Sequence, residues 1–241
     1  RGCTSTRSRP TAASNPTWAA PMMVPARTAT SPGCTSSPVR RTYAPDRTPR
    51  STRTRELPPS VQRSGSTASA SVGIGAPVWK KYFEPRKAIN LGFGGDRTNH
   101  VLWRLDHLPK LKKAPRGAVV LIGTNNICWG SDKPRQAADG VQAITRKLNA
   151  MYPKMKILVL GVFPRREQLN HPHRKQIIEL NSYLPDLLKD IPNVTFMDIG
   201  KEFLDDKGFL SREMMPDTTH PSEKAHEIWA QAIIPKLKEM M

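Results

Sequence analysis

From residue 76 onward, short apolar runs alternate with longer amphipathic stretches, and this alternation limits the folds available to the chain. A continuous apolar run of about four to eight residues is typical of a strand buried on both faces, and such strands joined by helices form a parallel sheet covered on both sides. Residues 76–241 are enough for one domain with a single core. We predict strands at residues 88–93, 118–122, 157–162 and 194–199, and helices near residues 97–108, 134–151, 173–189 and 222–240.

Two positions mark the starts of predicted helices. Pro134 suits the first turn of a helix, where its missing N–H costs no hydrogen bond. Ser222 followed by Glu223 is typical of a helix N-cap, so a helix is expected to begin just after His220.

The first 75 residues differ in composition from the rest of the chain. They contain eleven arginines, no lysine and two acidic residues, and they contribute half of the formal net charge of +18. They are rich in Ser, Thr, Pro and Ala and contain no apolar run long enough for a strand, so they cannot bury enough surface to offset the entropy of the chain. We therefore predict a basic, disordered N-terminal extension at residues 1–75 and a folded domain at residues 76–241.

Three interpretations of this extension stay open. It is a tail without a specific role, a basic arm that holds nucleic acid or another polyanion through phosphate contacts, or a segment translated in the wrong reading frame. Few aromatic residues and no recognisable module accompany the arginines, so we expect no specific nucleic-acid partner. The wrong-frame hypothesis rests on the abrupt change of composition near residue 75.

Three polar segments stand beside the predicted strands and helices. They are residues 90–98 (NLGFGGDRT), 123–126 (GTNN) and 217–222 (DTTHPS). Because ligand-binding groups gather at the carboxyl ends of the strands in an open parallel sheet, the first two segments are expected on one rim, together with the turn at residues 163–165 (FPR). The third segment carries a carboxylate three positions before an imidazole, and it can fold over the same rim.

In this order, the three segments resemble those of the SGNH (GDSL-type) esterase and lipase family. The stretch at residues 92–105 is most similar to the platelet-activating factor acetylhydrolase branch of that family, and the resemblance covers residues 78–241. It implies an α/β fold with a three-layer α/β/α, flavodoxin-like parallel sheet. It also implies hydrolysis of a small-molecule, lipid or sugar ester with a short, acetyl-like acyl group, without a metal or an organic cofactor.

The resemblance assigns roles to four residues. His220 is the general base and Asp217 holds its ring, while the backbone N–H of Gly95 and the side-chain amide of Asn125 belong to the oxyanion hole. Acyl transfer needs these residue types, because a nucleophilic hydroxyl must lose its proton to a neutral imidazole and a developing oxyanion must meet hydrogen-bond donors.

The nucleophile is where the sequence departs from the family. The family's first block, a buried strand that ends in Gly-Asp-Ser, is degenerate or missing here, and Pro58 and Pro59 argue against a central strand. Ser66 stands nearest the expected position, with Ser69 and Ser71 as alternatives. Without that strand, two inner edges of the sheet would be unpaired, so we expect a marginally stable or aggregation-prone chain. The wrong-frame hypothesis predicts that another frame of the upstream nucleotides encodes the missing block.

Other residues admit a functional and a structural interpretation. Arg97 and Arg165 could meet an ester or anionic oxygen near the rim, although solvated arginines are commoner. His171 and His173 suggest a metal site, but the proline between them and the lack of nearby Cys or acidic ligands favour a loop. Trp103, Trp129 and Trp229 are expected in the core and not as a substrate platform. Cys128 could line the site, but a small buried or half-buried thiol is expected.

We therefore predict a serine esterase of the SGNH type that uses Ser66, His220 and Asp217. The alternative is a protein without catalysis, either an inactive remnant of the fold or an interaction protein that binds polyanions. No run of about 18 apolar residues exists to span a membrane, and no signal-peptide layout is recognisable, which favours a soluble, cytoplasmic protein. A homodimer stays open.

Overall fold

A parallel sheet of three strands forms the centre of the molecule. The structure is a computed structural model, and it describes residues 73–241 except 110, 112 and 130–131. The strands run in the order β1 (Gly117–Val120), β2 (Lys156–Leu160) and β3 (Val194–Met197), and each pair is parallel. Three of the four predicted strands are thereby confirmed, as is the α/β class. The extension predicted at residues 1–75 lies outside the described residues except for its last three positions.

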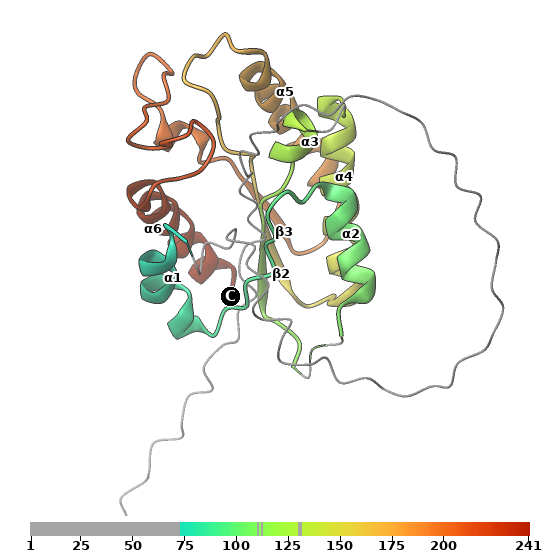
Figure 1. Cartoon of the computed structure of the whole chain (residues 1–241). Coiled ribbons are helices and arrows are strands. Elements are labelled where there is room, and N and C mark those ends of the chain that lie inside the picture. The colour runs from blue at the N-terminus through green and yellow to red at the C-terminus, as the bar shows by residue number, and fades with distance from the viewer. Residues whose placement is uncertain (1–72, 110, 112, 130–131) are drawn as a thin grey trace, which may run out of the picture.

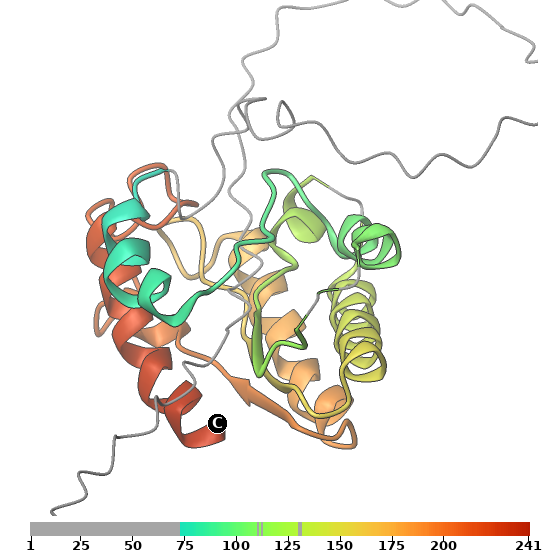
Figure 2. The same ribbon diagram turned by 90° about the horizontal axis from the view of Figure 1, so that it is seen from below.

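Helices cover both faces of this sheet (Figure 1). The four predicted helices are confirmed, and the structure adds two short α-helices and two 3-10 helices, η2 (Glu84–Arg86) and η3 (Gly200–Phe203). Figure 2 shows α1 and α6 on one side of the sheet and the other helices on the opposite side. The α-helices are α1 (Ala76–Tyr82), α2 (Thr98–His107), α3 (Thr124–Cys128), α4 (Pro134–Met151), α5 (Pro172–Leu188) and α6 (Glu223–Met240).

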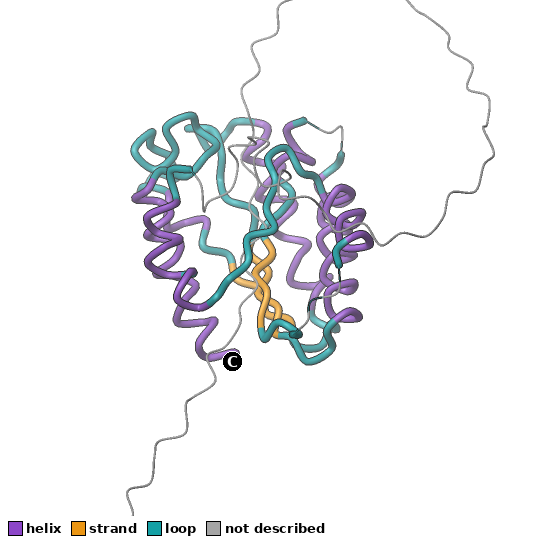
Figure 3. The backbone as a smooth tube through the Cα atoms, turned by 60° about the horizontal axis from the view of Figure 1, so that its bottom comes forward, coloured by secondary structure: helices purple, strands orange, loops and turns teal. Residues whose placement is uncertain are grey.

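Figure 3 shows the strands as a layer between two layers of helices, and the core fills both faces of this sheet. Successive side chains of a strand point to opposite faces. Ala118 and Val120 of β1 therefore pack in the cluster formed with α2, α4 and α5, whereas Val119 and Leu121 pack in the cluster formed with α1 and α6. All four side chains are buried. This double burial explains why β1 appears in the sequence as a continuous apolar run.

The predicted helix starts are confirmed. Pro134 is the first residue of α4, and the N–H of Lys133 before it donates to Gln136 Oε1 over 2.8 Å. Ser222 is the N-cap of α6, and its hydroxyl accepts the N–H of Ala225 over 3.2 Å. The first turn of a helix leaves N–H groups unpaired. Pro134 has no such group, and the Ser222 hydroxyl accepts one of them.

The strand predicted at residues 88–93 is wrong for the part of the chain that the structure describes. Of these residues only Ile89 forms a β-bridge, and within the described chain β1 pairs with β2 alone. An apolar cavity of about 230 Å³ lies between this segment and β1, with Ile89 and Leu91 on one wall and Ala118 and Val120 on the other. The family's first strand was expected between these two walls.

The tryptophans divide between core and surface. Trp229 is 1% exposed and packs edge-on against Phe163, so its predicted core position is confirmed. Trp103 and Trp129 are each 60% exposed, and the same prediction is wrong for them. Trp103 points away from the sheet on α2 and stacks on His107 at 4.2 Å, which gives the indole an apolar contact without burial.

Candidate active site

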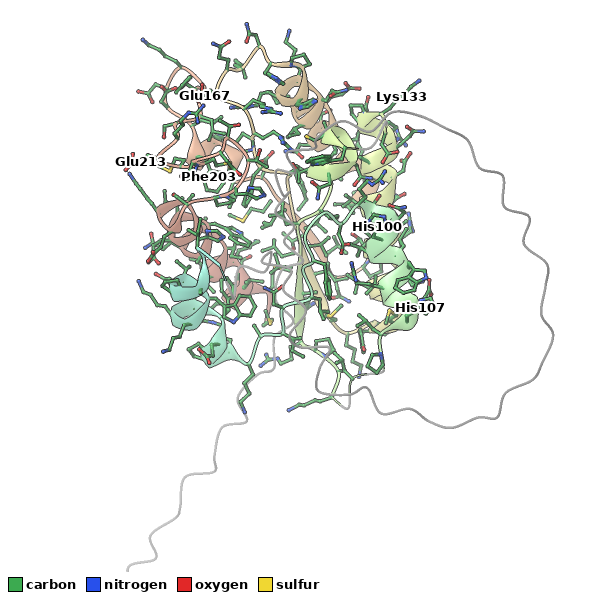
Figure 4. The ribbon with its side chains drawn as sticks, in the orientation of Figure 1. His100, His107, Lys133, Glu167, Phe203 and Glu213 are labelled. Atoms are coloured by element: carbon green, nitrogen blue, oxygen red, sulfur yellow. The ribbon has the colours of Figure 1, made fainter. Side chains whose placement is uncertain are left out.

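The loops that follow β1 and β2 and the loop that precedes α6 lie at one end of the molecule, at the top in Figure 1. Figure 4 labels Glu167 on the loop between β2 and α5, and Glu213 on the loop before α6. These two loops are joined, because Arg212 Nε donates to Glu167 Oε1 over 2.6 Å and Leu210 N–H donates to the Glu167 carbonyl over 2.9 Å. The expectation that the rim of the sheet gathers the polar segments is therefore met by these loops.

His220 and Asp217 form a hydrogen-bonded pair at this rim. Nδ1 of His220 contacts Asp217 Oδ2, while Asp217 Oδ1 accepts the backbone N–H groups of Thr219 at 3.0 Å and His220 at 2.7 Å. The segment is short, and Thr218 adopts a left-handed backbone conformation with φ of 63°. That turn brings a carboxylate and an imidazole three residues apart into contact.

The protonation states of the pair follow from its contacts. Burial alone would raise the pKa of Asp217, but the hydrogen bonds from the backbone and the ring of His220 outweigh it and hold that pKa below its ordinary value. An ionised carboxylate only accepts hydrogen bonds, so Nδ1 of His220 carries the hydrogen, and the second ring nitrogen, Nε2, points away from Asp217. Nε2 is buried and has no hydrogen-bond partner in the part of the chain that the structure describes.

Asn125 and Asn126 form hydrogen bonds that hold the glycine-rich segment, residues 90–98, beside the end of β1. Asn125 is fully buried, and its Nδ2 donates to the Asp96 carbonyl over 3.0 Å. Asn126 pairs with Thr98, accepting its N–H at 3.1 Å and donating to its hydroxyl at 2.9 Å. Two of the three polar segments are therefore held side by side by consecutive amide side chains.

Gly95 occupies the exposed turn beside this anchor. Its φ of +81° is strained for residues with a side chain, and space is open where a Cβ would stand. Its N–H makes no hydrogen bond within the described chain. One of the two Nδ2 hydrogens of Asn125 is also left for another acceptor, since Asp96 takes only one. The two predicted oxyanion donors thus lie on neighbouring segments, and each has a hydrogen to give.

Arg165 connects these segments to the His220 loop. It belongs to the turn after β2, it is 5% exposed, and its Nη1 and Nη2 donate to the hydroxyls of Thr124 at 3.4 Å and Thr219 at 3.0 Å. Both threonines line a small pocket whose apolar wall includes Ile122 and Phe163. Thr219 and Pro221, the neighbours of His220 on both sides, line this pocket, so the pocket adjoins the His220 loop. Sequence patterns did not reveal the threonines, because only the folded loops bring their hydroxyls to Arg165.

The remaining candidates are placed differently. Ser66, Ser69 and Ser71 lie outside the described residues. Cys128 is a free, half-buried thiol, and burial raises its pKa against the opposing influence of the nearby arginines. Arg97 is the N-cap residue of α2, where its own N–H donates to the ring of a histidine on the next turn.

His171 and His173 begin α5. The Nδ1 atom of His171 accepts the N–H of His173 over 3.2 Å, so His171 is the N-cap of the helix. Burial lowers the pKa of both rings, and the positive charges of Arg165 and Arg166 lower it further. The loop predicted around these histidines therefore ends at His171, and His173 lies in the first turn of α5.

Comparison with known proteins agrees with this geometry. Residues 61–228 match the model of the GDSL-like lipase/acylhydrolase family. The chain belongs to that family. The match covers most of the described domain and confirms the predicted resemblance, and it makes the chain a relative of acyl-ester hydrolases.

The curated relatives of this GDSL-like chain include platelet-activating factor acetylhydrolase subunits. Subunit alpha2 of the IB enzyme from Gallus gallus is 36% identical over 143 residues, which are 59% of this chain and 61% of the relative. Subunit alpha1 from Rattus norvegicus is 34% identical over 145 residues, or 60% and 61% of the two chains. The chain therefore spans about three fifths of the length of these relatives.

Solved structures of GDSL-like proteins share the fold. A putative platelet activating factor protein from Streptococcus pneumonia aligns with a TM-score of 0.59 and 23% identity over 67% of this chain and 77% of that chain. A GDSL-like lipase from Bacteroides thetaiotaomicron aligns with a TM-score of 0.59 and 17% identity, over 69% and 82% of the two chains. An acetyl-xylooligosaccharide esterase from Geobacillus aligns with a TM-score of 0.54 and 15% identity, over 71% and 83%. None of the described helices combines the length and apolar composition needed to cross a membrane.

Proposed function

We propose that this chain hydrolyses short acyl esters with His220 as its general base and acid. The observation that carries the proposal is the His220 ring itself. Its Nδ1 is held by the Asp217 carboxylate, and its Nε2 is buried without a partner among the described residues. A neutral imidazole in that state can accept a proton from a hydroxyl placed at Nε2.

The reaction then proceeds in two acyl transfers. Ser66 attacks the ester carbonyl carbon while His220 Nε2 takes the hydroxyl proton, and the same proton goes to the alcohol oxygen when its bond to carbon breaks. A water molecule next attacks the acylated serine, again with His220 as base, and the carboxylic acid leaves with restoration of Ser66. The Gly95 N–H and the Asn125 amide donate to the oxyanion in both halves. Asp217 orients the ring and stabilises its protonated form.

An acetyl ester is the substrate that we propose. The support comes from the relatives, whose names describe acetylhydrolase subunits and an acetyl-xylooligosaccharide esterase. Ser66 falls within the range that matches the family, which begins at residue 61. Ser66 is therefore the nucleophile to test first.

Hydrolysis of p-nitrophenyl acetate by the purified chain tests this function. We expect turnover in the native chain, and a loss of about a thousandfold or more in Ser66→Ala and in His220→Ala, because the residues of such a triad act as a unit. His107→Ala is the matched control, since His107 is an exposed imidazole on α2, away from the loops of the site (Figure 4). This control should retain the native rate.

Three other outcomes would contradict the proposal. Folded protein with no turnover above that of His220→Ala would identify an inactive member of the fold. Turnover that persists in Ser66→Ala but not in His220→Ala would move the nucleophile to another residue, with Ser69 and Ser71 as the next candidates. Association with nucleic acid that weakens steeply with salt would favour the polyanion-binding alternative.

A further inference from the structure

Arg165 is a nearly buried cation without a carboxylate partner among the residues that the structure describes. Its hydrogen bonds go to two neutral hydroxyls, those of Thr124 and Thr219, and its Nε is buried with no partner. Asp217 attracts Arg165 electrostatically, but the ion pair that Asp217 forms within the described chain is with His220. A guanidinium removed from water costs free energy unless an opposite charge compensates it. Within the described chain, Arg165 therefore has no carboxylate in direct contact.

The neighbouring Arg166 adds a second positive charge beside Arg165. Burial lowers the pKa of Arg165, and the positive charge of Arg166 lowers it further. The Nε of Arg166 is also buried without a partner in the described chain. Two adjacent guanidiniums beside neutral hydroxyls create a positive potential that an anion would relieve.

The two threonines carry this potential to the pocket. A hydroxyl oxygen that accepts a hydrogen bond from a cation keeps its own hydrogen free to donate in another direction. Thr124 and Thr219 both line the pocket next to His220, whereas Arg165 stands behind them. The pocket is thus bordered by two hydroxyls that accept a hydrogen bond from Arg165. The Thr124 hydroxyl also interacts with the Cys128 thiol, so Thr219 is the hydroxyl whose hydrogen is left for an acceptor of negative charge.

The pocket is small. It leaves about 40 Å³ open to a water-sized sphere. One water needs roughly 10–15 Å³ on this measure, so a group as small as a carboxylate can enter it.

Backbone hydrogen bonds hold the cluster in place. The Arg174 guanidinium is buried and donates to the carbonyls of Arg165 at 3.0 Å, Arg166 at 2.5 Å and Gly208 at 3.3 Å. The Arg166 N–H in turn donates to the Thr218 carbonyl over 2.9 Å, and both of these residues have positive φ. Strained backbone that is fixed from several sides is typical of functional sites.

We propose that Thr219, polarised by Arg165 and beside Thr124, binds a carboxylate carried by the ester substrate. The proposal rests on the esterase function proposed above, because the pocket adjoins His220. It deepens that function by naming the substrate class, a short ester with a free carboxylate on its alcohol part or its acyl part.

Two pairs of esters distinguish the alcohol part from the acyl part. The first pair is 4-acetoxybenzoate and its neutral methyl ester, and the second is monophenyl succinate and its methyl ester. We expect the native chain to prefer the anionic member of one pair in kcat/KM. Arg165→Met should lower that preference by about tenfold or more, the usual effect of losing a charge-assisted hydrogen-bond network, and Arg165→Lys should keep part of it. No preference in either pair, or a preference unchanged in Arg165→Met, would overturn the proposal.

Thr219 supplies a second test if Arg165→Met does not fold. Thr219→Val has the same shape without the hydroxyl, and Thr219→Ser keeps the hydroxyl. We expect Thr219→Val to lose the preference for the anionic ester and Thr219→Ser to retain it. An equal preference in the two variants would show that the hydroxyl does not bind the carboxylate.

An equilibrium measurement separates this proposal from the esterase function. Sodium acetate, compared with sodium chloride at equal ionic strength, should raise the melting temperature of His220→Ala but not of His220→Ala with Arg165→Met. That result would support the carboxylate site even if the native chain hydrolyses no ester. An equal acetate effect on both proteins, or a shift produced by phosphate and not by acetate, would overturn the site while leaving the Ser66 and His220 test unaffected.

Discussion

At the scale of single residues, Asp217 links the chemistry of the site to the stability of its loop. One carboxylate accepts the ring of His220 and two backbone N–H groups, and its pKa is lowered as a result. A carboxyl whose pKa is lower in the folded than in the unfolded chain stabilises the fold at pH values above the unfolded pKa, about 3.9. This contribution is lost as the pH falls through the folded pKa.

We predict that the Tm difference between the native chain and Asp217→Asn is constant above about pH 5 and shrinks below about pH 4, because both proteins then carry a neutral side chain. Thermal melts from pH 3 to pH 7 measure it. Asp186→Asn, at a side chain of α5 that is 88% exposed, is the control and should show no such trend. A difference that grows toward acid would contradict the assignment of Asp217 as an ionised acceptor.

At the scale of elements, Arg174 replaces regular secondary structure in the loops of the rim. It is 1% exposed, and it collects backbone carbonyls from the loop after β2 and from the loop before α6. Buried carbonyls that lose a charged donor cost about 1–3 kcal/mol each, partly offset by removal of the buried charge.

Arg174→Met should therefore lower the free energy of unfolding by about 2–3 kcal/mol, measured by urea denaturation. Lys175→Met changes the exposed neighbour on the same helix and should be nearly neutral. An unfolding free energy equal to that of this control would mean that the loops hold themselves without Arg174.

The elements also show how far sequence patterns reach. Three of the four predicted strands and the four long helices agree with the structure within about two residues, because apolar runs and helix starts are local signals. The short helix α3 was missed, since its five residues are too few for a helical period. The pair of Asp217 and His220 follows from a spacing of three, whereas the cluster around Arg165 depends on which loops meet in space. No local pattern contains that information.

At the scale of the whole molecule, we expect the outer edge of β1 to influence the solution behaviour. Within the described chain β1 pairs with β2 alone, and an apolar cavity lies beside its other edge. Open edges of this kind recruit strands from other molecules. The marginal stability or aggregation expected from the sequence stays a prediction. We expect the association to occur at this edge of β1.

Ile89→Lys should reduce concentration-dependent association, because it places a charge on the wall of that cavity, where the isoleucine is 40% exposed. Dynamic light scattering across a concentration series measures the effect. Ile178→Lys changes an equally apolar residue of α5, 52% exposed and away from this edge, and should leave association unchanged. Equal improvement in both variants would assign the effect to net charge.

The hydrogen bonds of Arg174 to the rim loops have a consequence for how freely the side chains of these loops can change. Its partners are backbone carbonyls, which every amino acid supplies, so the loops can exchange side chains without losing their anchor. The side chains of these loops can vary while the imidazole and its carboxylate keep their places. A single internal arginine thereby separates the surface that the loops present from the pair that they position.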